Sequence, residues 1–234
     1  MSPKKILLVA ATVREIEDIA ASLGCNGIRS VECNGGGALL QSEKLDCLVT
    51  GVGQFFTTLA LTETFKQGSY ATAIQVGIGG SFSDEYPIGS VVSIVEDGFA
   101  DCGAESLDGF LDLFEMGLWD PDKAPFSKGI VLQQPYALRR MTGLPEVRGV
   151  TVNRTLSSPG SINWVVERFS PIAVSMEGAA FLYLCAYFGV PCLQIRAISD
   201  RVGPRNKSAW DIPGALKALQ KPACGIITRL IALQ

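Results

Sequence analysis

Short apolar runs alternate along the chain with stretches in which apolar residues recur at helical spacing. In the first half, the apolar runs predict strands at residues 6–11, 46–50, 71–76 and 89–95. Between the first two runs, Ile16, Ile19, Ala20 and Leu23 share one face of an amphipathic helix over residues 14–23. A second helix is expected from about 55 to 66.

The same alternation resumes after an irregular segment. Residues 96–148 are rich in Gly, Pro and Asp, and we expect a surface excursion there with one helix near 136–142. Further strands are expected at 149–153, 172–175 and 192–199, and further helices at 177–188 and 213–233. This order predicts an α/β fold with a largely parallel sheet covered on both faces. In such sheets, ligands bind at the carboxyl ends of the strands.

One apolar stretch is long enough to compare with a membrane span. Residues 178–195 carry no charged side chain, and a helix that crosses a bilayer needs about 20 apolar residues. Because Gly189 and Pro191 interrupt the stretch, a helix followed by a buried strand is the better interpretation. We therefore expect no membrane-spanning segment.

Composition narrows the class of protein. The 234 residues are 47% hydrophobic and 18% charged, which is enough apolar material for a packed core. We expect one domain over residues 1–234, since no repeat or long linker divides them. A net charge of −3 without long charged runs argues against a nucleic-acid partner. The seven cysteines form no C-x-x-C pair, which favours free thiols and a cytoplasmic location.

The chain contains no histidine, and this limits its chemistry. Nucleophilic sites of the Ser-His and Cys-His types are excluded, and so are most histidine-based zinc sites. Acid–base catalysis must then depend on carboxylates, or less commonly on Lys, Tyr or Cys.

Carboxylates follow three of the predicted strands. Glu15 lies in the first turn of a helix, either as a functional group or as an acid favoured by the helix dipole. Glu177 opens a helix that is apolar on almost every side, where a buried carboxylate either binds partners such as sugar hydroxyls or caps its own helix. Asp200 ends a buried strand, where it is either a proton donor with a raised pKa or a turn residue.

Glycine-rich segments follow two other strands. Gly51-Val-Gly53 lacks the third glycine of a dinucleotide-binding fingerprint, because position 56 is Phe. In Gly77-Ile-Gly-Gly80, the backbone N–H groups would hold a ligand oxygen, or the chain would make a tight turn between strands. Both roles are compatible with the residues.

Two segments resemble the signatures of the nucleoside phosphorylase/nucleosidase superfamily: Ala173-Val-Ser-Met-Glu-Gly-Ala-Ala180 and Ile195-Arg-Ala-Ile-Ser-Asp200. The glycine segments and the turn before Glu15 fall where that family has its glycine loops and first catalytic turn. The resemblance covers essentially the whole chain and is weakest between about 100 and 150. It implies a single-domain, three-layer phosphorylase/hydrolase-like fold, with a mixed central sheet flanked by helices, and a homodimer or higher homo-oligomer.

The resemblance also implies an activity, cleavage of the N-glycosidic bond of a small-molecule purine nucleoside. Glu15 would orient and deprotonate the attacking water with help from Arg196, and Asp200 would protonate the base at N7. An acid and a base on opposite sides of the sugar match the two-carboxylate logic of an inverting glycosidase. This chemistry requires no metal ion and no organic cofactor.

The same resemblance assigns the residues that bind the substrate. Glu177 would bind the ribose hydroxyls, and Met176 would lie against the ribose. Ser199 would sit beside Asp200, and Gly80 belongs to the glycine segment that lets the substrate approach the backbone.

Within the superfamily, residues 199–213 are most similar to the futalosine hydrolases, which release hypoxanthine in the futalosine route to menaquinone. The alternatives are a methylthioadenosine/S-adenosylhomocysteine or aminofutalosine nucleosidase, a phosphorylase, and, in another class, a non-catalytic nucleoside-binding protein. Two positions depart from nucleosidase patterns: Ile78 stands where serine is frequent, and Ser175 where an acid is frequent. Glu15 favours water over phosphate as the nucleophile, since a carboxylate repels phosphate.

Futalosine carries a benzoate on its tail, which suggests a further hypothesis. Arg201 and Arg205 follow Asp200 and would meet the benzoate carboxylate. Phe55 follows Gly51-Val-Gly53 and would stack on the ring.

Overall fold

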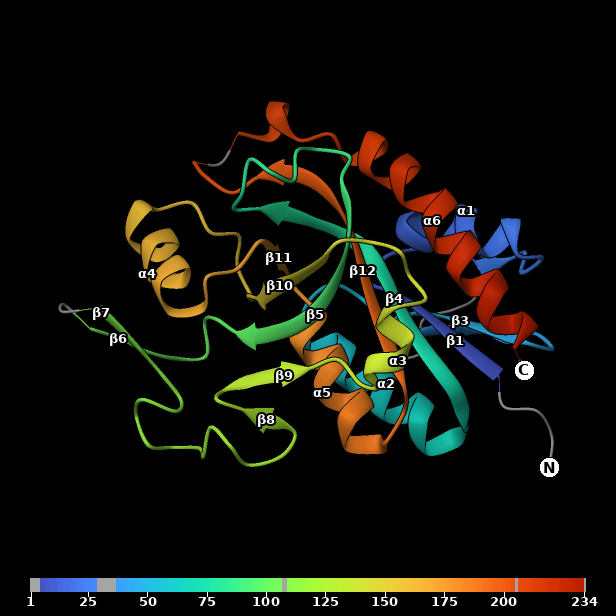
Figure 1. Ribbon diagram of the computed structural model, residues 1–234, viewed down its shortest axis with the longest axis horizontal. Coiled ribbons are helices and arrows are strands. Elements are labelled where there is room, and N and C mark those ends of the chain that lie inside the picture. The colour runs from blue at the N-terminus through green and yellow to red at the C-terminus, as the bar shows by residue number, and fades with distance from the viewer. Residues whose placement is uncertain (1–4, 29–36, 107–108, 205, 234) are drawn as a thin grey trace.

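The computed structural model describes residues 5–28, 37–106, 109–204 and 206–233. A large mixed sheet lies at its centre, with helices against both faces (Figure 1). The sheet contains the strands β1 (Lys5–Ala10), β2 (Ala38–Leu40), β3 (Leu45–Val49), β4 (Tyr70–Ser81), β5 (Val91–Phe99), β8 (Phe126–Ser127), β9 (Ile130–Leu132), β10 (Glu146–Thr151), β11 (Ala173–Ser175) and β12 (Cys192–Arg201). The helices are α1 (Val13–Ser22), α2 (Gln54–Gln67), α3 (Tyr136–Arg139), α4 (Pro159–Phe169), α5 (Gly178–Phe188) and α6 (Ile212–Ala232), with a 3₁₀ turn at Lys207–Ala209.

The strand pairing brings distant segments together. β1 pairs in parallel with β3 and β4, and β4 pairs in parallel with β12. β12 is antiparallel to β5, β5 is parallel to β10, β10 is parallel to β11, and β11 returns antiparallel to β4. These five strands, β4, β12, β5, β10 and β11, form a closed circuit. As a result Gly80 of β4 has Val174 of β11 on one side and Asp200 of β12 on the other.

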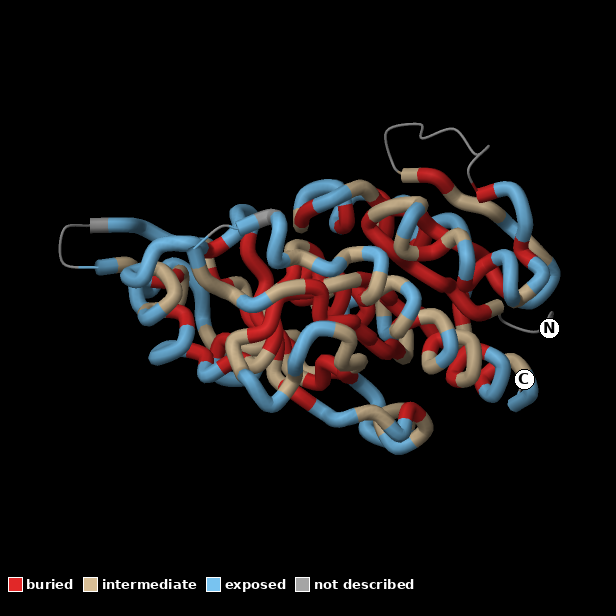
Figure 2. Tube along the Cα trace, turned by 90° about the horizontal axis from the view of Figure 1, so that it is seen from above, coloured by how far each residue is buried: buried red, intermediate tan, exposed pale blue. Residues whose placement is uncertain are grey.

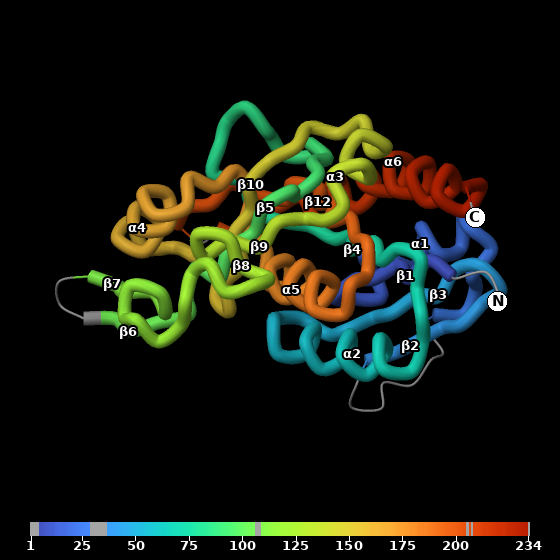
Figure 3. Tube along the Cα trace, turned by 60° about the horizontal axis from the view of Figure 1, so that its bottom comes forward, coloured from blue at the N-terminus to red at the C-terminus, as the bar shows by residue number. Residues whose placement is uncertain are grey.

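Two hydrophobic cores cover the two faces of the sheet. In β1, Ile6 and Leu8 face the core made with α1 and α6, whereas Leu7 and Val9 face the core made with α2 and α5. Successive side chains of a strand point to opposite faces, so a strand buried on both faces is continuously apolar. Figure 3 shows the resulting three layers, with α6 above the sheet and α2 and α5 below it.

Local signals fix the ends of the helices. α1 begins after Thr12, and Thr12 and Glu15 occupy the two positions of a capping box. α5 ends at Gly189 in the left-handed conformation, with φ at 66°. α6 begins after Asp211, whose carboxylate accepts a hydrogen bond from the Gly214 N–H at 2.9 Å.

The predicted α/β fold with a mixed sheet is confirmed, with two corrections in detail. β4 continues through the glycines to Ser81, so the tight turn considered at Gly77–Gly80 is wrong; these glycines pair with β12 instead. β12 likewise continues to Arg201, which places Asp200 inside the strand. α4 is absent from the sequence prediction, and its Val165 and Phe169 pack against β10.

The irregular segment forms the expected surface excursion. It contains a separate two-stranded sheet of β6 (Gly103–Ser106) and β7 (Gly109–Asp112), and then β8 and β9, which extend the main sheet beyond β5. Figure 2 shows buried residues concentrated in the centre of the molecule and exposed ones in the hairpin. Among the helices of the described residues, none has the length and apolar character needed to cross a membrane.

The core beneath α5 gives a first prediction. Phe181 is 0% exposed between α5 and α2, so Phe181→Ala should lower the free energy of unfolding by about 3–5 kcal/mol, measured by urea denaturation. Tyr187 lies on the same helix but is 70% exposed, and Tyr187→Ala should change that free energy by less than about 0.5 kcal/mol. Equal losses in the two variants would contradict this account of the core.

Candidate active site

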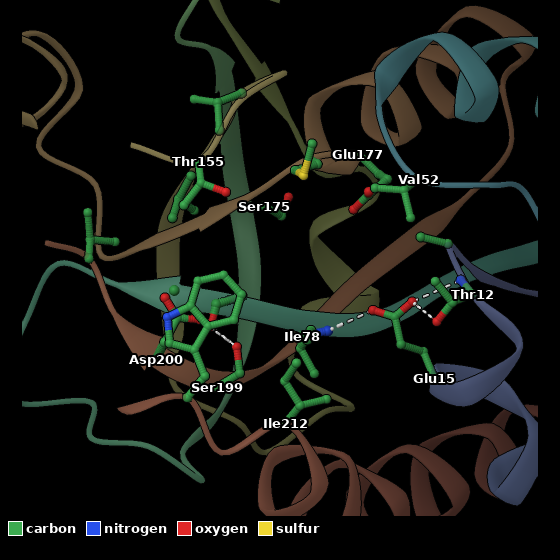
Figure 4. A pocket seen from close by; sticks show the side chains of 18 of the residues that line it. Thr12, Glu15, Val52, Ile78, Thr155, Ser175, Glu177, Ser199, Asp200 and Ile212 are labelled. Carbon is green, nitrogen blue, oxygen red and sulfur yellow. Dashed lines mark hydrogen bonds between the residues drawn. The ribbon is translucent and has the colours of Figure 1, made fainter. Parts of the chain in front are cut away.

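A cavity of about 330 Å³ opens where the carboxyl ends of β1, β4 and β12 meet the end of β11. In Figure 4, Glu15 and Asp200 lie on opposite sides of this cavity, with Ile78 between them and Glu177 on the side of Glu15. The residues from the sequence prediction that line it are Glu15, Gly80, Met176, Glu177, Ser199, Asp200 and Arg201.

Glu15 is held by three hydrogen bonds. Its Oε2 accepts from the Thr12 backbone N–H at 2.9 Å and from the Thr12 hydroxyl at 2.8 Å. Its Oε1 accepts from the Ile78 N–H of β4 at 3.1 Å. These donors come from the start of α1 and from the sheet, so they fix the carboxylate in one orientation at the mouth of the cavity.

Glu177 is the N-cap of α5 and is 5% exposed. Its Oε1 accepts from the Gly53 N–H at 3.0 Å, and its Oε2 lies 3.6 Å from Arg196 Nη1. Burial raises the pKa of Glu177, and the Arg196 charge and the Gly53 hydrogen bond oppose this effect. The carboxylate is therefore buried but partnered, as the physics of a buried charge requires.

Arg196 lies behind the cavity wall, with 1% of the residue exposed. Its Nη2 donates to Gln75 Oε1 at 2.8 Å, and its Nε to Gln194 Oε1 at 3.4 Å. A Cβ at Gly77 would collide with Arg196 Nη1 and would lie 2.8 Å from Glu15 Oε1. The missing side chain leaves room for the guanidinium, which pairs with Glu177, and for the Glu15 carboxylate. From this position Arg196 would act through Glu15 and Glu177 rather than by touching a ligand.

Asp200 faces the cavity from β12. The Ser199 hydroxyl donates to Asp200 Oδ1 at 2.7 Å. A Cβ at Gly80 would lie 3.1 Å from Asp200 Oδ2, so the glycine leaves room for that oxygen. Burial raises the pKa of Asp200, and the Ser199 hydrogen bond acts in the opposite direction. These features suit a group that carries a proton at Oδ2.

The wall between the acids is largely apolar. It is formed by Val52, Ile78, Val152, Leu156, Val174, Trp210, Ile212 and Leu216. The segment with Trp210 is tied to β12, because the Asp211 N–H donates to the Ser199 carbonyl at 2.9 Å. An apolar cavity with a few convergent polar groups is typical of a site for a small planar ligand.

A second cavity of about 490 Å³ shares Thr155 and Leu156 with the first. Its lining is more polar and includes Asp101, Glu105 and Arg154. In the part of the chain that the structure describes, no group of three or more His, Cys, Asp or Glu residues is placed to hold a metal ion.

The remaining predicted site residues lie elsewhere. Phe55 does not line the cavity: it is 74% exposed on α2, with its ring against Phe56. The chain turns at Gly53 into α2, so Val52 reaches the cavity and Phe55 falls on the outside of the helix. Arg201 lines the cavity and pairs with Asp84 at 3.1 Å. Arg205 lies outside the described residues.

The sequence prediction omits several polar residues of the site. Thr12 could have been predicted from the sequence, since Thr-x-x-Glu before an apolar run is the pattern of a capping box. Gln75 and Gln194 are amides inside apolar strands, and they pair in register between β4 and β12. Asp97 lies in the segment whose pattern is irregular, and no feature of the sequence singles it out.

A sequence profile of the phosphorylase superfamily matches residues 5–232. The chain belongs to this superfamily. Among its members, the futalosine hydrolase of Streptomyces coelicolor is 36% identical over 151 residues, which are 64% of this chain and 62% of that protein. The futalosine hydrolase of Acidothermus cellulolyticus is 30% identical over 222 residues, which are 94% of this chain and 88% of that protein.

Solved structures of the superfamily share the fold. The futalosine hydrolase of Helicobacter pylori superimposes with a TM-score of 0.71 over 97% of this chain and 95% of that chain, at 20% sequence identity. At this identity the comparison concerns the fold, which agrees with the mixed sheet and three layers described above.

The space at Gly77 gives a second prediction. Gly77→Ala should lower the free energy of unfolding by about 1–3 kcal/mol, because the new methyl group displaces the buried Arg196 and Glu15. Urea denaturation measures the change. Gly225 of α6 has open space around its Cβ position, and Gly225→Ala should instead stabilise the protein by up to about 1 kcal/mol. A Gly77→Ala variant as stable as the wild type would rule out the close packing described here.

Proposed function

We propose that the protein hydrolyses the N-glycosidic bond of a purine nucleoside and that its substrate is futalosine. The observation that carries this proposal is the placement of Glu15 and Asp200 on opposite sides of an apolar cavity (Figure 4). Glu15 is anchored at Ile78 and Asp200 lies beside Gly80, and two residues of a strand span roughly 7 Å. This spacing suits a sugar and a water between an acid and a base, as in an inverting glycosidase.

Asp200 is the acid of the proposed reaction. When the bond between C1′ and N9 breaks, its electron pair goes to the purine. A proton delivered to N7 neutralises that charge and makes the base a better leaving group. Burial raises the pKa of Asp200, which favours the protonated form that this step needs. The Ser199 hydroxyl occupies Oδ1, so Oδ2 is the oxygen that carries the proton.

Glu15 is the base. It accepts a proton from the water that attacks C1′ on the face opposite the purine. The hydrogen bonds from Thr12 and Ile78 hold the carboxylate still, so little reorganisation is needed in the transition state. Arg196 lies near Glu15, since a Cβ at Gly77 would meet both Arg196 Nη1 and Glu15 Oε1.

Glu177 binds the ribose, with Met176 against the sugar. A carboxylate accepts hydrogen bonds from two neighbouring hydroxyls, and Glu177 lines the cavity on the side of Glu15. Its negative charge also stabilises the positive charge that develops on the ribose as the bond breaks.

Two members of the superfamily that carry the name futalosine hydrolase, at 36% and 30% identity, support futalosine over other nucleosides. Arg201 lines the cavity and offers a cation to the benzoate carboxylate. Its partner Asp84 has a side chain 96% exposed, and such surface pairs exchange at little cost. Hydrolysis of futalosine would release hypoxanthine and place the protein in the futalosine route to menaquinone.

The protein is further inferred to work in the cytoplasm as a homodimer or larger homo-oligomer. The cysteines of the described residues are free thiols, which is typical of a reducing compartment. On α2, Phe55, Phe56 and Leu59 are 74%, 51% and 38% exposed, and such an apolar group is typical of an interface. Sedimentation velocity tests the assembly, and a monomer at micromolar concentration would contradict it.

The substrate is tested by incubating the protein with futalosine, aminofutalosine, methylthioadenosine and inosine, each with and without phosphate. We expect free hypoxanthine from futalosine at the same rate in both conditions. Release that depends on phosphate would indicate a phosphorylase. Faster release of adenine from methylthioadenosine would indicate the related nucleosidase activity, and no release from any nucleoside would overturn catalysis altogether.

The Ser199–Asp200 hydrogen bond predicts a change in the pH profile. Activity requires protonated Asp200, so kcat/KM should fall as the pH rises through the pKa of Asp200. Ser199→Ala removes a donor that favours the ionised form, so that pKa rises and the basic limb of the profile moves to higher pH.

Two further variants serve as controls for this measurement. Asp200→Asn should lower kcat by at least about 10²-fold at every pH. Ser22→Ala removes an exposed serine hydroxyl of α1 and should leave the profile in place. A basic limb that stays where it is in Ser199→Ala, or moves to lower pH, would remove Asp200 from the role of acid.

A further inference from the structure

A buried carboxylate outside the cavity is the feature that the proposed mechanism does not use. Asp97 of β5 is 1% exposed and does not line the cavity. Burial raises its pKa to about 6, while hydrogen bonds from Gln194 and Thr151 and the charge of Arg196 oppose the rise. A carboxylate in such a place is costly, so its retention calls for a physical role.

Both oxygens of Asp97 accept hydrogen bonds, and the two donors in turn bind the start of α5 and Arg196. The Thr151 hydroxyl donates to Oδ1 at 2.9 Å and itself accepts from the Ala179 N–H at 2.7 Å, in the first turn of the helix that Glu177 caps. Gln194 Nε2 donates to Oδ2 at 3.1 Å. Asp97 is thus linked to the start of α5 and to β12.

The amide of Gln194 connects Asp97 to Arg196. Its nitrogen faces Asp97, so its oxygen faces the other way and accepts from Arg196 Nε at 3.4 Å. If the amide were reversed, its N–H₂ group would face the guanidinium, and neither group could accept. An acceptor at Asp97 is therefore what keeps the oxygen of Gln194 on Arg196.

Asp97 and Gln194 are packed closely against the backbone of α5. A Cβ at Gly178 would collide with both Asp97 Oδ2 and Gln194 Oε1. The first helical residue after Glu177 is thus a glycine that lies directly on the contact between the carboxylate and the amide.

We propose that Asp97 is a positioning residue of the active site: it fixes the amide of Gln194, which holds the Arg196 guanidinium against Glu177. Where catalysis is concerned, this inference rests on the proposed function. The network contains three carboxylates, Glu15, Glu177 and Asp97, and a single guanidinium. Glu177 pairs with that cation, and Glu15 lies near it beside Gly77, so the direction of the guanidinium affects the charge around both glutamates.

The test exchanges the carboxylate of Asp97 and the amide of Gln194. In Asp97→Asn, one hydrogen bond of the network must be lost, since Thr151 and Gln194 donate to different oxygens of Asp97 and an amide has an acceptor at only one of these two positions. In the double variant Asp97→Asn/Gln194→Glu, the new amide donates to the new carboxylate, which still accepts from Arg196 Nε, and Thr151 still has an acceptor. The exchange conserves the net charge and nearly conserves the volume.

Two readouts are needed. The first is the rate of hydrogen exchange of the Arg196 Nε–H, followed by ¹⁵N–¹H NMR and assigned with Arg196→Lys, which requires no substrate. Asp97→Asn should accelerate this exchange by at least about 10-fold, and the double variant should restore it. The second is kcat for the nucleoside, which should fall by about 10-fold or more in Asp97→Asn and recover in the double variant to within about threefold of the wild type.

Two other variants keep the result interpretable. Gln194→Met leaves Asp97 its bond with Thr151 and removes only the link to Arg196, so it should show the same two changes even if Asp97→Asn fails to fold. Asp46 of β3 is equally buried, at 2% exposed, and is bound by Lys5 and Tyr70 away from the cavity. Asp46→Asn should lower the melting temperature and leave the exchange rate and kcat unchanged.

The outcomes separate the two proposals. Unchanged exchange and kcat in folded Asp97→Asn or Gln194→Met, or a double variant no better than Asp97→Asn, would overturn the positioning role. A wild-type protein that releases no base from any nucleoside would overturn the proposed function, and the NMR measurement would still decide whether Asp97 holds Arg196.

Discussion

The ion pair between the buried Arg196 guanidinium and Glu177, at 3.6 Å, is the interaction on which the rest of the site depends. Taking an ion out of water costs several kcal/mol unless partners replace the water. Arg196 is 1% exposed and finds such partners in Gln75, Gln194 and Glu177. Each partner comes from a different part of the chain: β4, β12 and the start of α5. Correct placement of the guanidinium therefore requires that the sheet and α5 are already packed, and the active site cannot form ahead of the fold.

The glycines of β4 destabilise the strand but leave the space that the site needs. Glycine in the middle of a strand loses more conformational entropy on folding than other residues and packs no side chain. In β4 the space is used at each step: Gly77 admits Arg196 and Glu15, a Cβ at Gly79 would press on the Val174 carbonyl, and Gly80 admits Asp200. The closed circuit of strands offsets the weakness, because β4 is paired with β1, β12 and β11 along its length. A strand with so little side chain would be poorly held at the edge of an open sheet.

The limits of sequence-based prediction follow from the same geometry. The apolar runs predict most of the strands because both faces of the sheet are buried. Glu177 and Asp200 stand out because they border apolar segments, whereas Glu15 lies in a polar helix turn and is identified through the family resemblance. The glycine run of β4 misleads, since glycine is as compatible with a turn as with a strand whose neighbours need space. Phe55 is expected at the site because it follows Gly51-Val-Gly53. The direction of its side chain, however, depends on where α2 begins. Asp97 could not be predicted from the sequence. It is a single acid in an irregular segment, and its burial results from packing against a strand and a helix that come later in the chain.

The charges of the site also set a limit on stability. Burial raises the pKa of Asp97 from 3.8 to about 6, and it raises the pKa of Glu177 and Asp200 as well. A carboxyl group whose pKa is higher in the folded state than in the unfolded chain binds more protons when folded. Its favourable contribution is therefore complete below the unfolded pKa and is lost as the pH rises through the folded pKa. For Asp97 this window runs from about pH 4 to about pH 6, so its contribution is lost at neutral pH.

The proposed chemistry requires the ionised form of Glu177 and the protonated form of Asp200. Their surroundings differ: Arg196 and the Gly53 N–H lower the pKa of Glu177, whereas only the Ser199 hydroxyl lowers that of Asp200. The same fold thus gives the buried Glu177 and the half-buried Asp200 different tasks by placing a buried positive charge beside only one of them.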